Sequence, residues 1–166
     1  MKTITEQQHL FKHVMGNYPT GVAVVTTLTE EGIPVVLTVN SFASVSLDPL
    51  MILWSIDHRV SSIKAFVEAG KFAVHILAAD QAALCTIFAS SKKDRFSQCD
   101  WNVSDNGLPS IKSVLAVLEC KTFKTVVAGD HTILIGEVIN INMKQGEPLL
   151  YHRRHFGAIP SEFYPE

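Results

Sequence analysis

The segments VLAVLECKTFKTVV (residues 114–127) and HTILIGEVININM (residues 131–143) decide the fold of this chain. Both are long and rich in Val, Ile, Thr and Phe, the residue types that suit a pleated, half-buried backbone. The connection between them, Ala128-Gly129-Asp130, is typical of a tight turn. We therefore predict a long antiparallel β-hairpin, whose apolar faces need further strands to cover them.

Four shorter β-rich runs precede this hairpin in the sequence. They start at Gly21 with a valine-rich stretch and continue over residues 34–42, 50–56 and 71–77. Turn sequences, Glu30-Glu31-Gly32 and Asp48-Pro49, separate the first three runs. The chain thus has about six strands in mostly hairpin-like order, which favours an antiparallel β-barrel over a doubly wound parallel sheet.

Three segments have apolar residues at helical spacing, over residues 6–15, 61–69 and 81–89. Thr5 with Gln8 fits a capping box for the first helix, and Asp80 could cap the third. The polar stretch of residues 90–106 is expected to be mostly loop, and the tail of residues 149–156 to pack or pair. The predicted helices are therefore peripheral to the strands.

The composition indicates a single domain spanning residues 1–166. The chain is 47% hydrophobic and only 18% charged, which excludes intrinsic disorder. Its net charge of −2 lacks the basic excess of a nucleic-acid-binding domain. No apolar run approaches the roughly 20 residues of a membrane span. We therefore expect neither a nucleic-acid partner nor a membrane.

The cysteines and histidines give no metal motif. Cys85, Cys99 and Cys120 form no C-x-x-C pair, so we expect reduced, mostly buried thiols in a cytoplasmic protein. The first residues lack the apolar stretch of a secretory signal, which agrees with that location. His9 and His13 have a spacing that could bind a metal, but no third ligand is close in sequence, so a solvated helix face is expected. No P-loop, dinucleotide fingerprint, zinc-protease motif or nucleophile elbow occurs.

Two polar segments follow predicted strands. Thr38-Val39-Asn40-Ser41-Phe42 continues into Ser44, Val45 and Ser46, and offers small donors and acceptors that suit the edge of a flat ring. The alternative is a strand end with polar capping side chains. His58-Arg59-Val60-Ser61-Ser62 precedes a predicted helix, where free N–H groups and hydroxyls can bind an anion, or where Ser61 simply caps the helix.

Two further polar segments each allow two interpretations, a binding site or a solvated loop. Ala89-Ser90-Ser91-Lys92-Lys93-Asp94-Arg95-Phe96 combines cations with hydroxyls, which suits either a phosphate or a solvated loop. Gly129-Asp130-His131 presents an imidazole at the tip of the long hairpin, where it can face a cleft or plain solvent. Each segment is weak evidence by itself.

In this order, the segments resemble the flavin reductase domain family, small FMN-binding split-barrel proteins that include the reductase components of two-component flavin monooxygenases. The resemblance spans residues 14–157. It is carried by the segments above and by several shorter motifs, Pro19-Thr20-Gly21, Asp48-Pro49-Leu50, Phe72-Ala73-Val74-His75-Ile76-Leu77, Leu118-Glu119-Cys120 and Pro148-Leu149-Leu150-Tyr151. It implies a mainly β fold, a six-stranded antiparallel split β-barrel (Greek key) with peripheral α-helices.

The resemblance also implies roles for particular residues. Thr38, Asn40 and Ser41 are expected along the isoalloxazine and ribityl groups of FMN or FAD, with Trp54 and Ser55 beside them. Ser61, Lys92 and Arg95 are expected at the phosphate, and Phe96 next to it. The expected cofactor-binding set is completed by Val39, Ser46, Ala89, Gly129, Asp130, Tyr151 and Arg153.

The implied reaction is hydride transfer from C4 of NADH or NADPH to N5 of the flavin, which needs no catalytic base. His131 is the expected catalytic residue, as a group that orients the nicotinamide. Reduced flavin is expected to diffuse to a partner monooxygenase. Two other functions fit the same fold: a flavin-binding electron-transfer or storage protein, and an oxidase of a small substrate such as a pyridoxine phosphate.

The high share of apolar residues, taken with the family resemblance, also bears on the oligomeric state. A single split barrel of this size exposes part of its apolar surface, whereas a dimer buries it. We therefore predict an obligate homodimer, with flavin near the subunit interface.

Overall fold

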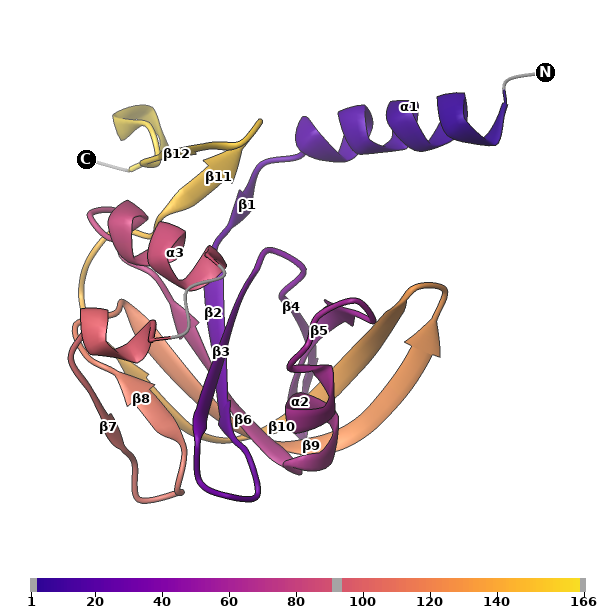
Figure 1. The fold of residues 1–166 in the computed structure, drawn as a ribbon. Coiled ribbons are helices and arrows are strands. Elements are labelled where there is room, and N and C mark those ends of the chain that lie inside the picture. Colours follow the sequence, from indigo (N-terminus) through magenta and orange to yellow (C-terminus); the bar gives the residue numbers. More distant parts are fainter. Residues whose placement is uncertain (1–2, 91–93, 165–166) are drawn as a thin grey trace.

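The computed structural model describes residues 3–90 and 94–164, and its main sheet has seven antiparallel strands (Figure 1). In spatial order they are β3 (Pro34–Val39), β2 (Ala23–Leu28), β6 (Lys71–Ile76), β9 (Ala116–Ala128), β10 (His131–Met143), β5 (Leu50–Asp57) and β4 (Ala43–Leu47). All six predicted strands belong to this sheet. The order ends at β3 and β4, which do not pair, so the sheet curls into a split barrel rather than a closed one.

The hairpin of β9 and β10 is confirmed, and each of its strands has 13 residues. Ala128 pairs with His131, so Gly129 and Asp130 make the turn. Gly129 has a φ of 64°, which a residue without Cβ adopts at little cost. Along its other edge β10 pairs with β5, and His131 lies opposite Asp57. The hairpin tip therefore lies beside the end of β5.

The seventh strand, β4, is absent from the sequence prediction. Its residues alternate between apolar side chains and serine, and its valine and leucine, Val45 and Leu47, are 48% and 88% exposed. This is an edge strand without the apolar run that identifies the other strands. It forms because the turn at Asp48-Pro49 brings Leu47 opposite Leu50, so that β4 pairs with β5.

Two hydrophobic cores lie on opposite faces of β2. Val24 points into the first, which α3 and the residues around β8 cover, and Val25 points into the second, inside the curve of the main sheet. Both faces of β2 are buried, which explains why its sequence does not alternate between apolar and polar residues. Its buried threonines, Thr26 and Thr27, donate their hydroxyls to the carbonyls of Pro109 and Lys71. At the centre of the second core Trp54 meets Phe66 and Phe72 edge to face, with ring centroids 5.2 and 5.7 Å apart.

Gly136 gives the second core room for Phe72. A register shift interrupts the pairing of β10 with β9 between Ile135 and Gly136. A Cβ on Gly136 would lie 2.5 Å from Cζ of Phe72 and 2.9 Å from Cβ of Cys120, closer than side-chain carbons pack. Glycine at this position therefore lets the Phe72 ring lie directly against β10.

Four short helical segments of the described chain lie around the sheet. They are α2 (Ile63–Glu68), α3 (Ala82–Ala89) and the 3₁₀ turns η1 (Phe96–Gln98) and η2 (Ser161–Phe163). Those that contribute buried residues are α2 to the second core and α3 and η1 to the first. The prediction that Asp80 caps α3 is wrong, because Gln81 occupies the N-cap position. Ser62 rather than Ser61 occupies that position in α2, and its side chain makes no capping hydrogen bond.

The predicted loop of residues 90–106 is partly ordered into secondary structure. It contains η1 and strand β7 (Trp101–Val103), which pairs with β8 (Pro109–Ile111). Trp101 packs on Phe96 with ring centroids 4.9 Å apart, and this contact attaches the small hairpin to the first core. A third sheet joins β1 (Thr20–Gly21), β11 (Leu150–His152) and β12 (His155–Gly157), in which the tail pairs as expected.

Helix α1 (Ile4–Gly16) projects from the body of the molecule (Figure 1). Its capping box is formed by Thr3 and Glu6, not by Thr5 and Gln8 as the sequence suggests. No residue of α1 is buried, and Phe11 and Val14 are 67% and 56% exposed. Among the described residues, no helix is both long and apolar enough to cross a membrane.

Candidate active site

Three neighbouring cavities follow β3 towards its C-terminal end. The first, of about 410 Å³, lies between β3, the residues before α2 and the end of α3. The second and third measure about 240 and 710 Å³. Thr38 and Ala89 line both the first and the second, and Asn40 lines both the second and the third. We call this row of cavities the β3 groove, lined in part by Thr38, Val39, Asn40, Ser41, Ser61, Ala89, Arg95 and Tyr151.

Arg95 is the cation at one end of the β3 groove. Its Nη1 donates a 2.9 Å hydrogen bond to the carbonyl of Phe88, which fixes the guanidinium beside α3. Burial lowers the pKa of Arg95. No ion pair with a carboxylate is found for it within residues 3–90 and 94–164. A half-buried guanidinium in this setting, next to the hydroxyl-bearing Ser61 and Ser62, can bind an anion such as a phosphate.

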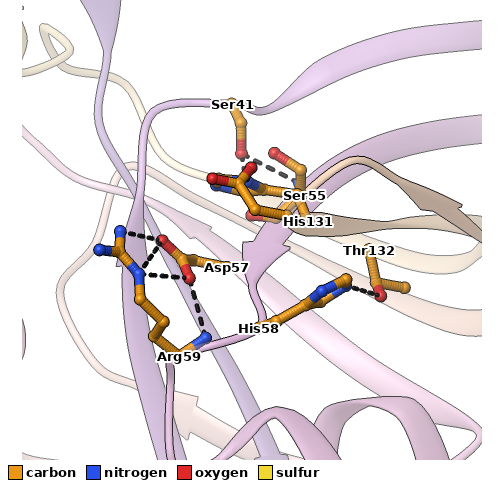
Figure 2. A network of polar contacts seen from close by, with 8 residues as sticks. Ser41, Ser55, Asp57, His58, Arg59, His131 and Thr132 are labelled. Atoms are coloured by element: carbon orange, nitrogen blue, oxygen red, sulfur yellow. Dashed lines mark hydrogen bonds and ion pairs between the residues drawn. The ribbon is translucent and has the colours of Figure 1, made fainter. Parts of the chain in front are cut away.

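Ser41 links the end of β3 to the opposite side of the split barrel. Its hydroxyl donates to the carbonyl of Ser55 at 3.2 Å and accepts from the N–H of Ser55 at 3.0 Å (Figure 2). Ser55 lies on β5 and pairs with Ile133 on β10. The Ser41 hydroxyl therefore connects the β3 groove to the strands that carry His131.

His131 lies at the hairpin tip within a cluster of charged groups (Figure 2). Its Nδ1 is 2.7 Å from Oδ1 of Asp130, and its side chain is 40% exposed. Asp57, opposite in the ladder, is held by Arg59 through Nε and Nη2, the latter 2.5 Å from Oδ2. Arg59 holds the pKa of Asp57 well below its usual range, and the hydrogen bond from His131 lowers the pKa of Asp130. Both carboxylates are therefore ionised at neutral pH, and the one on Asp130 orients the imidazole.

The loop after β5 is attached to the hairpin tip by a second histidine. Nε2 of His58 lies 3.0 Å from the hydroxyl of Thr132, which is buried (Figure 2). The N–H of His58 donates to the carbonyl of Asp130 at 2.9 Å. The position of the tip relative to β5 is thus set by side-chain and backbone contacts together.

The profile of the family described as "Flavin reductase like domain" matches residues 15–160 of the chain. The chain belongs to this family. Among its relatives, the FMN reductase (NADH) SmoA of Agrobacterium fabrum is 44% identical over 154 residues, which cover 93% of this chain and 87% of that protein.

Solved structures agree with the flavin reductase fold. The nitrilotriacetate monooxygenase component B of Mycobacterium thermoresistibile superposes with a TM-score of 0.92 and 33% identity, over 99% of this chain and 93% of that one. The NADH:FAD oxidoreductase of Streptomyces globisporus, in complex with NAD and FAD fragments, gives a TM-score of 0.90 and 31% identity, over 99% of both chains.

Most residues expected at the site of the flavin reductase domain lie at one of two places. Those that line the β3 groove are Thr38, Val39, Asn40, Ser41, Ser61, Ala89, Arg95 and Tyr151. Arg153 lines an adjoining cavity together with Asn40 and Tyr151. Ser55, Gly129, Asp130 and His131 lie on β5 and the hairpin tip, which Ser41 connects to the groove.

The structure does not bring three expected residues to the groove of the flavin reductase domain. Trp54 is fully buried in the second core, so its side chain cannot lie along a flavin. Phe96 packs into the first core between Phe88 and Trp101. Ser46 lies on the edge strand β4 and accepts a hydrogen bond from the N–H of Asp48. Lys92 lies outside the described residues.

Two features of this candidate site were not assigned to particular residues by the sequence. Ser62 lines the first cavity beside Ser61, and it is part of the polar segment from His58 to Ser62. Asp57 neutralises Arg59, which removes that cation from the anion site expected in the same segment. The second point depends on the local side-chain geometry after β5, which brings the Arg59 guanidinium onto the Asp57 carboxylate. Within the described chain, no three His, Cys, Asp or Glu side chains form a cluster that could hold a metal ion.

Proposed function

We propose that this flavin reductase domain transfers hydride from NADH to FMN or FAD in the β3 groove and supplies the reduced flavin to a monooxygenase. The family membership and the names of the relatives support the NAD(P)H:flavin oxidoreductase activity. The assignment of the site rests on the β3 groove. The Arg95 guanidinium lies at one end of this groove, and polar side chains near the end of β3 line it further along.

The residues of the β3 groove suit a flavin mononucleotide group. Cavities that bind ligands of this size measure about 300–1,000 Å³ and are lined by apolar side chains with a few well-placed polar groups. The first cavity has that size, at about 410 Å³, and combines Arg95 with serine hydroxyls, a donor set that fits a phosphate. Thr38 and Asn40 offer a hydroxyl and an amide further along, which fit the polyol chain and the polar edge of a flavin.

When bound, a flavin accepts the hydride that the nicotinamide donates, so the organic chemistry belongs to the two cofactors. The protein has to hold them in contact and in the right orientation. In our assignment Arg95 anchors the phosphate, while Thr38, Asn40 and Ser41 position the ring system along β3. Hydride transfer needs no base, and therefore the cluster around His131 acts through orientation.

His131 is suited to orient a nicotinamide. The Asp130 carboxylate accepts from Nδ1–H and so fixes the ring, which leaves Nε2 as the atom available to a ligand. An imidazole nitrogen in that position can hydrogen-bond the carboxamide of a nicotinamide. Ser55 and Asp57 lie on the same face of β5, so the ladder that positions His131 also carries the Ser41 contact.

We also propose that the active form is a homodimer. No side chain of α1 is buried within the described chain, and its apolar residues Leu10, Phe11, Val14 and Met15 are 45–67% exposed. The two opposite ends of the β9–β10 hairpin expose further apolar residues, Val127 at 74% near the tip and Met143 at 75% at the other end. Apolar surfaces of this extent are covered in stable proteins by another surface, and a second copy carries the same one.

The test of the proposed activity is NADH oxidation by the purified protein, with and without added FMN or FAD. We expect NADH consumption only when flavin is present, and transfer of the reduced flavin to an added flavin-dependent monooxygenase that makes no contact with this protein. Retention of a yellow cofactor without NADH consumption would contradict the reductase assignment and favour an electron carrier.

A further inference from the structure

The hairpin of β11 and β12 has a turn of unusual composition. His152 pairs with His155, so the turn consists of Arg153 and Arg154 alone. Both have a left-handed backbone, with φ of 49° and 67°. A two-residue hairpin with two such φ values favours Asn-Gly, and each residue that has a Cβ costs roughly 1 kcal/mol there. Strain of this kind at two consecutive arginines points to a role for their side chains.

The arginine turn is attached to the C-terminal end of α1. The N–H of Arg153 donates to the carbonyl of Gly16 at 3.1 Å, and its Nε donates to Oδ1 of Asn17 at 2.7 Å. Figure 1 shows the β11–β12 hairpin beside β1 and the adjoining end of α1. Asn17 thus holds the guanidinium of Arg153, whereas that of Arg154 makes no hydrogen bond or ion pair with the described part of the chain.

Between α1 and the arginine turn lies a cavity of about 670 Å³, which we call the arginine pocket. Three cations, Lys12, Arg153 and Arg154, line it together with His13, and no Asp or Glu of the described residues does. This is a local excess of positive charge on a chain whose net charge is −2. Tyr18 and Tyr151 add aromatic rings to the lining. The pocket therefore combines anion binding with surfaces on which a flat base can stack.

The arginine pocket continues the β3 groove. Asn40 and Tyr151 line both the arginine pocket and the second cavity of the groove, and Tyr18 lines both the pocket and the third. A ligand whose reactive ring lies in the groove can thus extend into the pocket without leaving the surface. Arg95, the candidate partner for the flavin phosphate, lines the first cavity and not the arginine pocket.

We propose that the arginine pocket binds the adenosine diphosphate group of a dinucleotide cofactor, with Arg154 as the main contact to the diphosphate. This inference rests on the proposed function, because NADH and FAD both carry that group. The guanidinium of Arg154 and the ammonium of Lys12 face the two negative charges, and the tyrosine rings face the adenine.

The substitution Arg154→Gly tests this proposal without endangering the turn. Glycine is the residue that φ of 67° favours, so the variant keeps the hairpin while it loses the guanidinium. Arg154→Lys keeps the charge, and Lys112→Ala, at an exposed lysine after β8, is the control for loss of a cation elsewhere. Circular dichroism checks that all three variants fold.

The readout is the dissociation constant from calorimetry for two ligand pairs, NAD⁺ against nicotinamide mononucleotide and FAD against FMN. In at least one pair, we expect Arg154→Gly to weaken binding of the dinucleotide about tenfold, which corresponds to the loss of one charge-assisted hydrogen bond. Binding of the mononucleotide of the same pair should weaken less than about twofold. The pair that responds identifies which cofactor uses the pocket. Arg154→Lys should recover most of the affinity, and Lys112→Ala should change none of the four constants.

Two results would overturn the proposal: unchanged affinity for both dinucleotides, or equal weakening of a dinucleotide and its mononucleotide. Neither depends on turnover. If the purified protein oxidised no NADH in the presence of flavin, the proposed function would fail, while the binding comparison would still decide whether the arginine pocket takes adenosine diphosphate.

Discussion

His131, the first residue of β10, lies opposite Asp57, the last residue of β5, and each has its own charged partner, Asp130 and Arg59. The ion pair of Asp57 leaves Asp130 as the carboxylate that orients the imidazole. Because the ladder fixes the backbone of His131 and Asp130 fixes its ring, this side chain can position a ligand without contributing to the fold.

We expect His131→Ala to lower the rate of flavin reduction at least tenfold and to change the Kd for FMN less than threefold, since one neutral hydrogen bond is worth about 1 kcal/mol and more in a positioned complex. Anaerobic stopped-flow measurement of the reduction rate, with fluorescence titration of FMN, separates the two quantities. His9→Ala, at an exposed position on α1, is the matched control. Unchanged turnover with NADH in His131→Ala would remove this residue from the site.

Arg95→Ala should weaken FMN binding about 10- to 100-fold, because a charge-assisted hydrogen bond contributes roughly 1.5–3 kcal/mol. Riboflavin has the same ring system without the phosphate, so its affinity should change little. Arg95→Lys keeps the charge and should show a smaller effect on FMN. Comparable losses for FMN and riboflavin in Arg95→Ala would mean that Arg95 supports the loop after α3 and not the phosphate.

His75 makes stability depend on pH. Its ring is fully buried, Nδ1 donates to the carbonyl of Val24 and Nε2 accepts from the N–H of Ile111, so the folded protein needs the neutral imidazole. Burial lowers the pKa of His75 to about 4, against about 6.5 in the unfolded chain. Its contribution is therefore complete above pH 6.5 and is lost as the pH falls towards 4, by about 3 kcal/mol.

Urea unfolding between pH 7.5 and pH 4.5 measures this loss. His75→Gln cannot titrate, so its stability should vary less over the same range, whatever its stability at pH 7.5. His9→Gln should keep the profile of the original protein. Glu119 is the carboxylate that interacts electrostatically with His75, and its own pKa is lowered. Glu119 therefore titrates mostly below the pH range of this experiment. Equal pH profiles for His75→Gln and the original protein would refute the prediction.

Gly136→Ala should lower the free energy of unfolding by about 1–3 kcal/mol, the usual cost of forcing an extra methyl group into a packed core. The new Cβ would meet the Phe72 ring and Cys120. Gly157→Ala is the control, because a Cβ there would have no heavy atom of another residue within 4 Å among the described neighbours, and surface changes usually stay within about 0.5 kcal/mol. Adding Phe72→Leu to Gly136→Ala should recover part of the loss.

Light scattering should give twice the chain mass of 18.3 kDa if the proposed homodimer forms. A charge on the apolar face of α1, as in Val14→Glu, should shift the protein towards the monomer, because an unpaired carboxylate would be buried in the interface. Ile33→Glu, at an exposed apolar position in the β2–β3 turn, should leave the mass unchanged. A monomeric mass for the original chain would contradict the dimer.

Periodicity and turn chemistry were sufficient for the strands that bury apolar residues. The β9–β10 hairpin and β2 were predictable because both are rich in β-forming residues, and the hairpin also has a tight-turn sequence between its strands. Strand β4 was not predictable, because its residues are held in place by pairing with β5 and do not form a hydrophobic core of their own. The cap of α1 was misplaced by two residues because several polar residues near the helix start could make the same hydrogen bonds. The cap of α3 was misplaced by one residue, and Gln81 occupies that position without a side-chain capping hydrogen bond.

The candidate site was predictable to the extent that its residues follow strand ends. Thr38, Asn40 and Arg95 line the groove as the family resemblance implies. The sequence does not reveal which face of β5 points into the second core, and the structure buries the Trp54 side chain there, away from the groove. The ion pair of Asp57 with Arg59 depends on local side-chain geometry, and the left-handed conformation of Arg153 and Arg154 depends on the backbone of a tight turn. The residue types alone do not reveal either feature.

The double burial of β2 separates two kinds of position in this protein. Each buried apolar residue of β2 packs into one of the two cores, so any substitution there disturbs a core, whereas Thr38, Asn40, Arg95 and Arg154 lie near strand ends, in loops and in turns around it. An engineer can therefore alter cofactor choice at these peripheral positions in small independent steps, with a scaffold whose stability is determined elsewhere.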